Sequence, residues 1–108
     1  MRIHGEQGIF LKMNTRKIET HKELCDFLHS LYVKKNADYG DSYAKVRKEY
    51  PNAILIRLSD KFERLKTLLN SGEQKVNDES VQDTFLDLAN YCLLECVERT
   101  EDLTNGKK

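Results

Sequence analysis

Three acidic side chains recur at helical spacing in the last third of the sequence. Glu79, Asp83 and Asp87 are four residues apart, with no lysine or arginine between them. At about 100° per residue, they share one face of a helix with Asn90. Like charges at this spacing destabilise an isolated helix, so we expect a positive partner to meet the stripe. That partner is the basic face of another helix, a divalent cation, or both, and such oxygen ligands suit Mg²⁺ or Mn²⁺.

A second polar face lies on the preceding apolar segment. Arg57, Asp60, Glu63 and Arg64 are predicted to lie opposite its apolar side, and Lys61 adds a further cation. In the simplest interpretation, Asp60 forms surface ion pairs with Arg57 and Arg64, each worth ~0.2–0.5 kcal/mol. In the functional interpretation, the cations meet the acidic stripe or contact phosphates. The apolar side is expected to comprise Ile54, Leu55, Leu58, Phe62, Leu65, Leu68 and Leu69.

The stretch KKNADYG, residues 34–40, is predicted to be a basic, aromatic turn. Lys35 could contact phosphate, and Tyr39 could stack on a base. Asp38 could accept a hydrogen bond from a sugar or base edge, or join a metal shell. The alternative is an ordinary helix C-terminus, at which basic residues complement the helix dipole and a glycine follows.

The sequence predicts that all of these residues lie on helices or at helix ends. A helix is expected from Thr20, with Glu23 as the partner of its N-cap, and it should fade over residues 34–40. A short helix over residues 41–50 follows, capped by Asp41 or Ser42. Pro51-Asn52 opens a third helix, which Asn70-Ser71-Gly72 ends. The fourth is capped by Asn77 or Asp78.

These elements predict a single all-α domain, a small helical bundle of three long helices and one short helix. Residues 1–14 are expected to form an N-terminal arm or a short hairpin, residues 20–98 the helical core, and residues 99–108 a polar tail. The core stripe of the last helix is predicted to comprise Val81, Phe85, Leu88, Ala89, Cys92 and Cys96. We expect these two cysteines and Cys25 to be small buried hydrophobes.

The composition narrows the class of protein. The sequence has 39% hydrophobic and 33% charged residues, with 18 basic and 18 acidic side chains and a formal net charge of zero. This balance gives no strong case for nucleic-acid binding. No apolar run approaches the length of a bilayer span, and no signal peptide is evident, so we expect no membrane association and a cytoplasmic protein.

The three polar stretches together resemble the nucleotide modification associated domain 1 family of phages and bacteria. Their order is KNxDYGxS, then RLxDKxxRL, then ExxxDTxxDLANY, and the resemblance covers about residues 24–97. It rests on Lys35, Asn36, Asp38, Tyr39, Gly40, Ser42, Arg57, Leu58, Asp60, Lys61, Arg64, Leu65, Glu79, Asp83, Thr84, Asp87, Leu88, Ala89, Asn90 and Tyr91. It implies a link to modified nucleotides or phage nucleotide metabolism, in the host cytoplasm if the protein is phage-encoded.

A more distant similarity is to the all-α MazG-like nucleotide pyrophosphohydrolases. That family binds Mg²⁺ against a nucleoside triphosphate with an EExxE element, a spacer and an ExxD element. Asp60-x-x-Glu63 resembles the end of the first element, and Glu79 and Asp83 resemble the second. Here Ser59 precedes Asp60 in place of the double glutamate, and the second pair is spaced ExxxD.

Three hypotheses about function follow. The first is a nucleotide-handling domain. If it is an enzyme, it releases pyrophosphate from a nucleoside triphosphate, with Asp60, Glu63 and Asp83 as catalytic residues. Its Mg²⁺ ligands would be Asp60, Glu79, Asp83 and Asp87, and its substrate contacts would be Lys35, Asp38, Tyr39, Arg57, Lys61, Arg64, Asn90 and Tyr91. The second is a non-catalytic binder of a nucleotide or nucleotide-derived signal. The third is a protein-interaction module of a DNA-modification or phage–host system. Apolar Ile56 and Leu94 on polar faces suggest a homo-oligomer.

Overall fold

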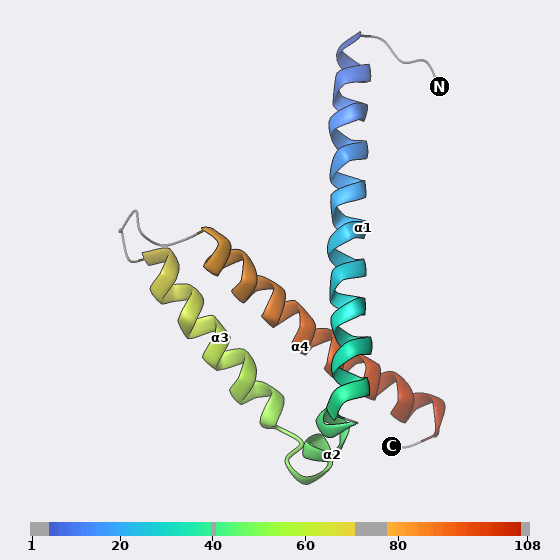
Figure 1. Ribbon diagram of the computed structural model, residues 1–108, viewed down its shortest axis with the longest axis vertical. Coiled ribbons are helices and arrows are strands. Elements are labelled where there is room, and N and C mark those ends of the chain that lie inside the picture. The colour runs from blue at the N-terminus through green and yellow to red at the C-terminus, as the bar shows by residue number, and fades with distance from the viewer. Residues whose placement is uncertain (1–4, 40, 71–77, 107–108) are drawn as a thin grey trace. The chain divides into compact units, whose positions relative to one another are not determined.

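The computed structural model describes residues 5–39, 41–70 and 78–106, and side chains within 15–37, 41–70 and 80–106 (Figure 1). It confirms the all-α class, with three long helices and one short helix. The helices are α1 (Gly5–Tyr39), α2 (Ser42–Glu49), α3 (Ala53–Asn70) and α4 (Asp78–Thr104). The described residues contain no strand. None of the described helices is long and apolar enough to cross a membrane. The chain divides into two compact units, Met1–Gly40 and Asp41–Lys108.

The first unit contains α1, which begins well before the predicted start at Thr20. Residues 5–14, predicted to form an arm or a hairpin, lie in this helix. Thr20 is not an N-cap, because its hydroxyl donates to the carbonyl oxygen of Arg16 over 2.9 Å within the helix. Glutamate, glutamine, leucine, lysine and methionine are strong helix formers, and in this segment they outweigh two glycines.

Residues 34–39 also belong to α1 and do not form the predicted turn. The stretch is half lysine and alanine, which favour helix, and the helix ends only at Tyr39, immediately before Gly40. The alternative interpretation of this stretch, a helix C-terminus followed by glycine, matches the backbone.

In the second unit, α2 leads into α3 through a tight connection. The Asp41 carbonyl accepts the first hydrogen bond of α2, from Lys45 N–H over 3.2 Å, and the Asp41 side chain makes no cap. Tyr50 closes α2 by donating to the Val46 carbonyl over 2.8 Å. Pro51 cannot continue the α2 hydrogen-bond ladder, and α3 begins two residues later, as predicted.

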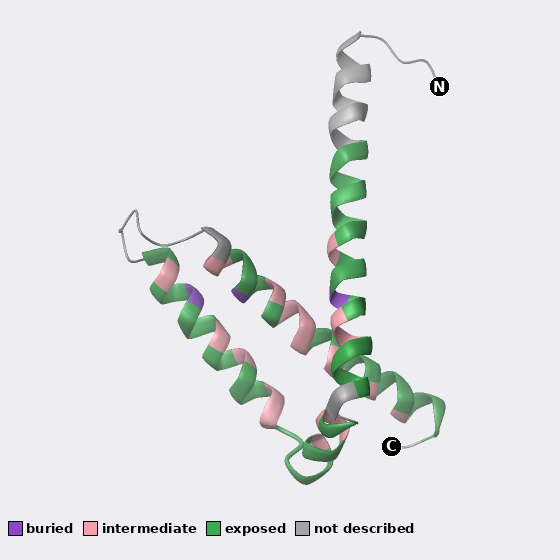
Figure 2. Cartoon of the chain, viewed as in Figure 1, coloured by how far each residue is buried: buried purple, intermediate pink, exposed green. Residues whose placement is uncertain are grey.

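Helices α3 and α4 lie side by side and form the main packing of the second unit (Figure 1). Their shared seam is narrow. Among the described residues 41–70 and 80–106, only Leu65 and Thr84 are buried, at 4% and 3% exposure (Figure 2). The seam positions of α3 are Ile54, Leu58, Lys61, Leu65 and Leu68, which alternate steps of four and three residues.

The predicted core stripes are only partly correct. Leu55, Phe62 and Leu69 of α3 are exposed, and Lys61 takes a seam position in their place. On α4, Phe85 is exposed. All three cysteines, Cys25, Cys92 and Cys96, are exposed where burial was expected. An apolar stripe on a helix spans more than 100°, whereas one neighbouring helix covers only the part of it that faces the seam.

The C-terminal end of α4 extends into the predicted polar tail. Residues 99–104 remain helical, and Gly106 then adopts a positive φ of 70°. Asn105 N–H donates to the Glu101 carbonyl over 2.9 Å, and Gly106 N–H donates to the Leu103 carbonyl over 3.2 Å. A glycine in the left-handed region is a common helix stop, because it lacks the side chain that this conformation disfavours.

Candidate functional site

Three cations of α3 reach across the seam to three residues of α4. The Arg57 guanidinium lies 5.8 Å from the centre of the Tyr91 ring. Lys61 Nζ lies 3.5 Å from Asp87 Oδ2. Arg64 Nε donates to the Thr84 hydroxyl over 3.3 Å. We call these contacts Arg57–Tyr91, Lys61–Asp87 and Arg64–Thr84 the cation row.

The spacing of the cation row shows that the two helices are antiparallel. Along α3 the cations advance by four residues and then by three, and along α4 their partners retreat by the same steps. Steps of three and four residues return to the same face of a helix. The three cations therefore lie on one face of α3, and their three partners lie on the facing side of α4. The predicted meeting of the basic face with the acidic stripe therefore occurs, through Lys61 and Asp87.

Thr84 anchors one end of the cation row. It is almost completely buried, and its hydroxyl donates to the Ser80 carbonyl over 2.8 Å while it accepts from Arg64. A buried hydroxyl is costly unless both of its roles are used, and here both are. Arg64 is thereby held against α4, although it is exposed to solvent.

The predicted ion pairs of Asp60 with Arg57 and Arg64 are absent, because both arginines turn toward α4. Within the described side chains, neither arginine forms an ion pair with a carboxylate. Glu63 instead pairs with Lys66 over 2.9 Å on the solvent side of α3. Asp60 and Asp83 are exposed. Two guanidinium groups therefore remain without a carboxylate partner in this part of the chain.

The acidic residues proposed as Mg²⁺ ligands do not form a metal site among the described side chains. No three histidine, cysteine or acidic groups there are close enough to hold a metal ion. Asp87 already pairs with Lys61. Glu79 lies in the first turn of α4, and its side chain is outside the described residues. A Mg²⁺ site needs convergent oxygen ligands, and the three proposed ligands whose side chains are described, Asp60, Asp83 and Asp87, do not form such a group among themselves.

The remaining predicted contact residues divide between the two units. Asn90 and Tyr91 are half-buried on α4 beside the cation row. Lys35 is exposed near the end of α1. The backbones of Asp38 and Tyr39 form the last residues of α1, and their side chains are outside the described residues.

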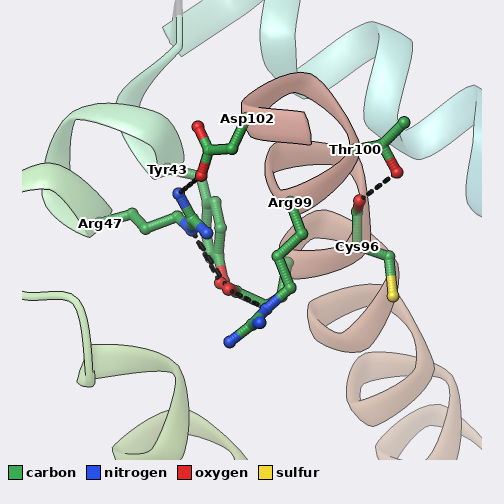
Figure 3. Close-up of polar contacts among 7 residues, drawn as sticks. Tyr43, Arg47, Cys96, Arg99, Thr100 and Asp102 are labelled. Atoms are coloured by element: carbon green, nitrogen blue, oxygen red, sulfur yellow. Dashed lines mark hydrogen bonds and ion pairs between the residues drawn. The ribbon is translucent and has the colours of Figure 1, made fainter. Parts of the chain in front are cut away.

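Sequence reasoning missed a second polar cluster, which joins α2 to the C-terminal half of α4 (Figure 3). Arg47 Nε donates to both carboxylate oxygens of Glu95, over 3.1 and 3.2 Å, and Arg47 Nη1 donates to Asp102 over 3.0 Å. The Tyr43 hydroxyl donates to Glu95 over 2.9 Å, and Arg99 Nε donates to the same carboxylate over 2.9 Å. Glu95 thus accepts from three side chains.

Burial and charge shift the ionisation of this cluster. Burial alone would raise the pKa of Glu95, but the hydrogen bonds from Arg47 and Tyr43 outweigh burial and hold that pKa below its ordinary value. The hydrogen bond to Glu95 raises the pKa of Arg47. Burial, reinforced by the hydrogen bond to Glu95, raises the pKa of Tyr43. Burial also raises the pKa of Glu98, and the charge of Asp41 adds to this effect.

A signal for this cluster was present in the sequence. Glu95 is the single charged residue between Tyr91 and Val97, a run that is otherwise apolar. A carboxylate held among apolar side chains needs a cation or several donors. Tyr43 and Arg47 could not be assigned as its partners from the sequence, because they lie about fifty residues earlier, on a helix whose orientation depends on the fold.

A comparison with known protein families finds a match to the part of the chain that contains these residues. The family model described as nucleotide modification associated domain 1 matches residues 35–98, which include α2, α3, the cation row and Glu95. No curated protein and no solved structure matches the chain. The family match covers more than half of the sequence. The chain therefore belongs to the nucleotide modification associated domain 1 family.

Proposed function

We propose that this chain is a nucleotide-binding domain in which the cation row holds the phosphates. The observation that carries the proposal is the state of Arg57 and Arg64, which lie seven residues apart with Lys61 between them. Neither arginine has a carboxylate partner in the described part of the chain, and the partner of Lys61 is mostly exposed. At 1.5 Å per residue, the three cations extend over about 10 Å of one helix. Guanidinium groups suit phosphate because they offer paired donors in one plane.

Tyr91 of the cation row and the adjacent Asn90 suit the rest of a nucleotide. The Tyr91 ring is half-buried and already has a cation against it, as expected of a ring that stacks with a flat group. Asn90 is also half-buried, and its amide offers both donors and acceptors for a base or sugar. The family description, which concerns nucleotide modification, supports this assignment.

The carboxylates favour binding over hydrolysis. Pyrophosphate release of the kind suggested by the MazG-like resemblance needs acidic residues converging on Mg²⁺. Asp87 is paired with Lys61 instead, and the described acidic groups do not converge. Phosphate binding by the cation row requires no metal, so the binding function does not depend on Mg²⁺.

The test is a thermal melt of the full chain with nucleoside mono-, di- and triphosphates, each with Mg²⁺ and with EDTA. A ligand at 100 times its dissociation constant adds ~2.7 kcal/mol, which is several degrees for a domain of this size. We expect a shift that persists in EDTA, shrinks in Arg64→Gln and is retained in Lys48→Gln, which removes an exposed cation of α2. The absence of a shift with every ligand, or a shift only with Mg²⁺, would overturn the proposal.

A further inference from the structure

Helices α3 and α4 leave an apolar face uncovered on one side of their seam. We define the apolar face as Leu55, Phe62 and Leu69 of α3 with Phe85, Cys92 and Cys96 of α4, all of which are exposed. Phe62 is 56% exposed and Phe85 is 49% exposed. Isolated exposed apolar residues are normal on a protein surface, but a contiguous group on two helices indicates an interface.

Helix geometry places these residues on one side of the pair. On α3, the three apolar-face residues each follow a seam position by one residue, and on α4 they follow Thr84, Tyr91 and Glu95 by one residue. An advance of one residue along a helix rotates the side-chain direction by about 100° about the helix axis. Because the helices are antiparallel, this rotation turns both of them toward the same side of the seam. The polar residues Asp60, Asp83 and Asn90 precede seam positions by one residue, so they lie on the opposite side.

The contacts of the cation row also show which apolar-face residues of α3 and α4 lie opposite each other along the helix axes. Lys61 lies against Asp87 and Arg64 against Thr84, so Phe62 of α3 and Phe85 of α4 lie at nearly the same level. On α3 the apolar-face residues repeat every seven residues. A heptad repeat is the spacing with which helices pack at shallow angles in coiled coils and four-helix bundles.

The side of the α3–α4 pair that carries the apolar face is large enough for a specific contact. The 18 residues of α3 extend about 27 Å at 1.5 Å per residue. Two helices about 10 Å across give a width of about 20 Å, and hence a flat footprint of roughly 500 Å² on one copy. Two such faces bury about 1,000 Å² in total, the lower limit for a specific protein–protein interface.

We propose that the apolar face packs against the same face of a second copy of this chain, so that two α3–α4 pairs form a four-helix bundle. A second copy supplies an equally apolar surface with the same heptad spacing, and a two-fold contact satisfies both copies at once. The defining residues of the face carry no charge, which disfavours an anionic partner such as nucleic acid or a lipid surface. Lys66, one residue after the seam position Leu65, lies on the same side as the apolar face, where its ammonium is 5.4 Å from the centre of the Phe62 ring and pairs with Glu63 over 2.9 Å. Arg57 and Arg64 precede the seam positions Leu58 and Leu65 by one residue, so these two arginines lie on the other side of the seam.

The test measures the mass of the full chain in solution by light scattering, over a range of concentrations. We expect twice the 12.6 kDa mass of one chain, and the mass of one chain for Phe62→Glu and Phe85→Glu. Ile56→Glu is the matched control. Ile56 is more exposed, at 74%, but it lies outside the apolar face, so this variant should keep the double mass. Circular dichroism reports whether each variant remains helical.

If Phe62→Glu unfolds, the melting temperature of the unmodified chain decides the question. A dimer melts at a higher temperature as its concentration rises, whereas a monomer does not. An unmodified chain with the mass of one copy and a concentration-independent melting temperature overturns the proposal, and α1 or another protein would then cover the face. Equal loss of the double mass in Ile56→Glu and Phe62→Glu also overturns it. Nucleotide binding is scored separately, so the two proposals can fail independently.

Discussion

Arg64 of α3 and Thr84 of α4 are joined by a hydrogen bond of 3.3 Å, at the most completely buried polar side chain among the described residues. The hydroxyl of Thr84 also donates to the carbonyl of Ser80. One small side chain therefore links the cation row to the backbone of α4. Thr84 and Leu65 of α3 are the two buried residues of the described part of the second unit.

Replacing Thr84 with valine should destabilise the second unit by about 1 kcal/mol or more, because Arg64 loses its partner while the shape is conserved. Thr100→Val is a close control. Thr100 makes the same bond to the carbonyl four residues earlier, over 2.8 Å to Cys96, but it is exposed. We expect Thr100→Val to change the free energy of unfolding by less than about 0.5 kcal/mol. Urea denaturation of both variants checks this, and equal effects would mean that the contact with Arg64 contributes nothing.

Glu95 should make the stability of the chain sensitive to acid. Its pKa in the fold is below the ordinary 4.5, so its ionised form stabilises the folded state above that pH. This contribution is lost as the pH falls through the lower, folded pKa. Glu95→Gln should cost about 2 kcal/mol at pH 7, because charged hydrogen bonds from Arg47 are replaced by a poorly matched amide. The free energy of unfolding of the Glu95→Gln variant should also fall less steeply below pH 4.5 than that of the unmodified chain.

Glu98, three residues later on α4, provides the control of opposite sign. Burial raises its pKa in the fold, so its ionised form destabilises the folded state at neutral pH. Glu98→Gln should therefore raise the melting temperature at pH 7, and this gain should disappear in acid, where Glu98 is protonated. Melting curves from pH 3 to pH 8 measure both variants. A loss of stability in both at pH 7 would contradict the assigned environments.

Much of the fold follows from local sequence patterns. Pro51 and Asn70 bracket α3 because proline cannot continue the preceding ladder and an Asn-Ser-Gly stretch favours a turn. The meeting of Lys61 with Asp87 also follows, because uncompensated acids at a spacing of four residues need a positive neighbour.

The positions of the apolar side chains could not be predicted from the same patterns. The apolar stripe of α3 is wider than its seam with α4, and periodicity alone does not show which part of the stripe the neighbour covers. Phe62 and Phe85 were therefore assigned to the core and are exposed. Likewise, the partners of Glu95 lie on α2, and only the packing of α2 on α4 brings Tyr43 and Arg47 to it.

Asp87 provides the most direct test of phosphate binding by the cation row, because the binding and metal hypotheses predict opposite effects of its removal. Its carboxylate competes with phosphate for Lys61, and such an exposed pair contributes about 0.5–1 kcal/mol. The measurement is calorimetric titration of nucleoside triphosphates in EDTA, with Asp60→Asn as a control for the loss of one nearby charge. We predict that Asp87→Asn binds about two- to fivefold more tightly than the unmodified chain, and more tightly than Asp60→Asn. Weaker binding in Asp87→Asn, or no binding by the unmodified chain, would contradict the account.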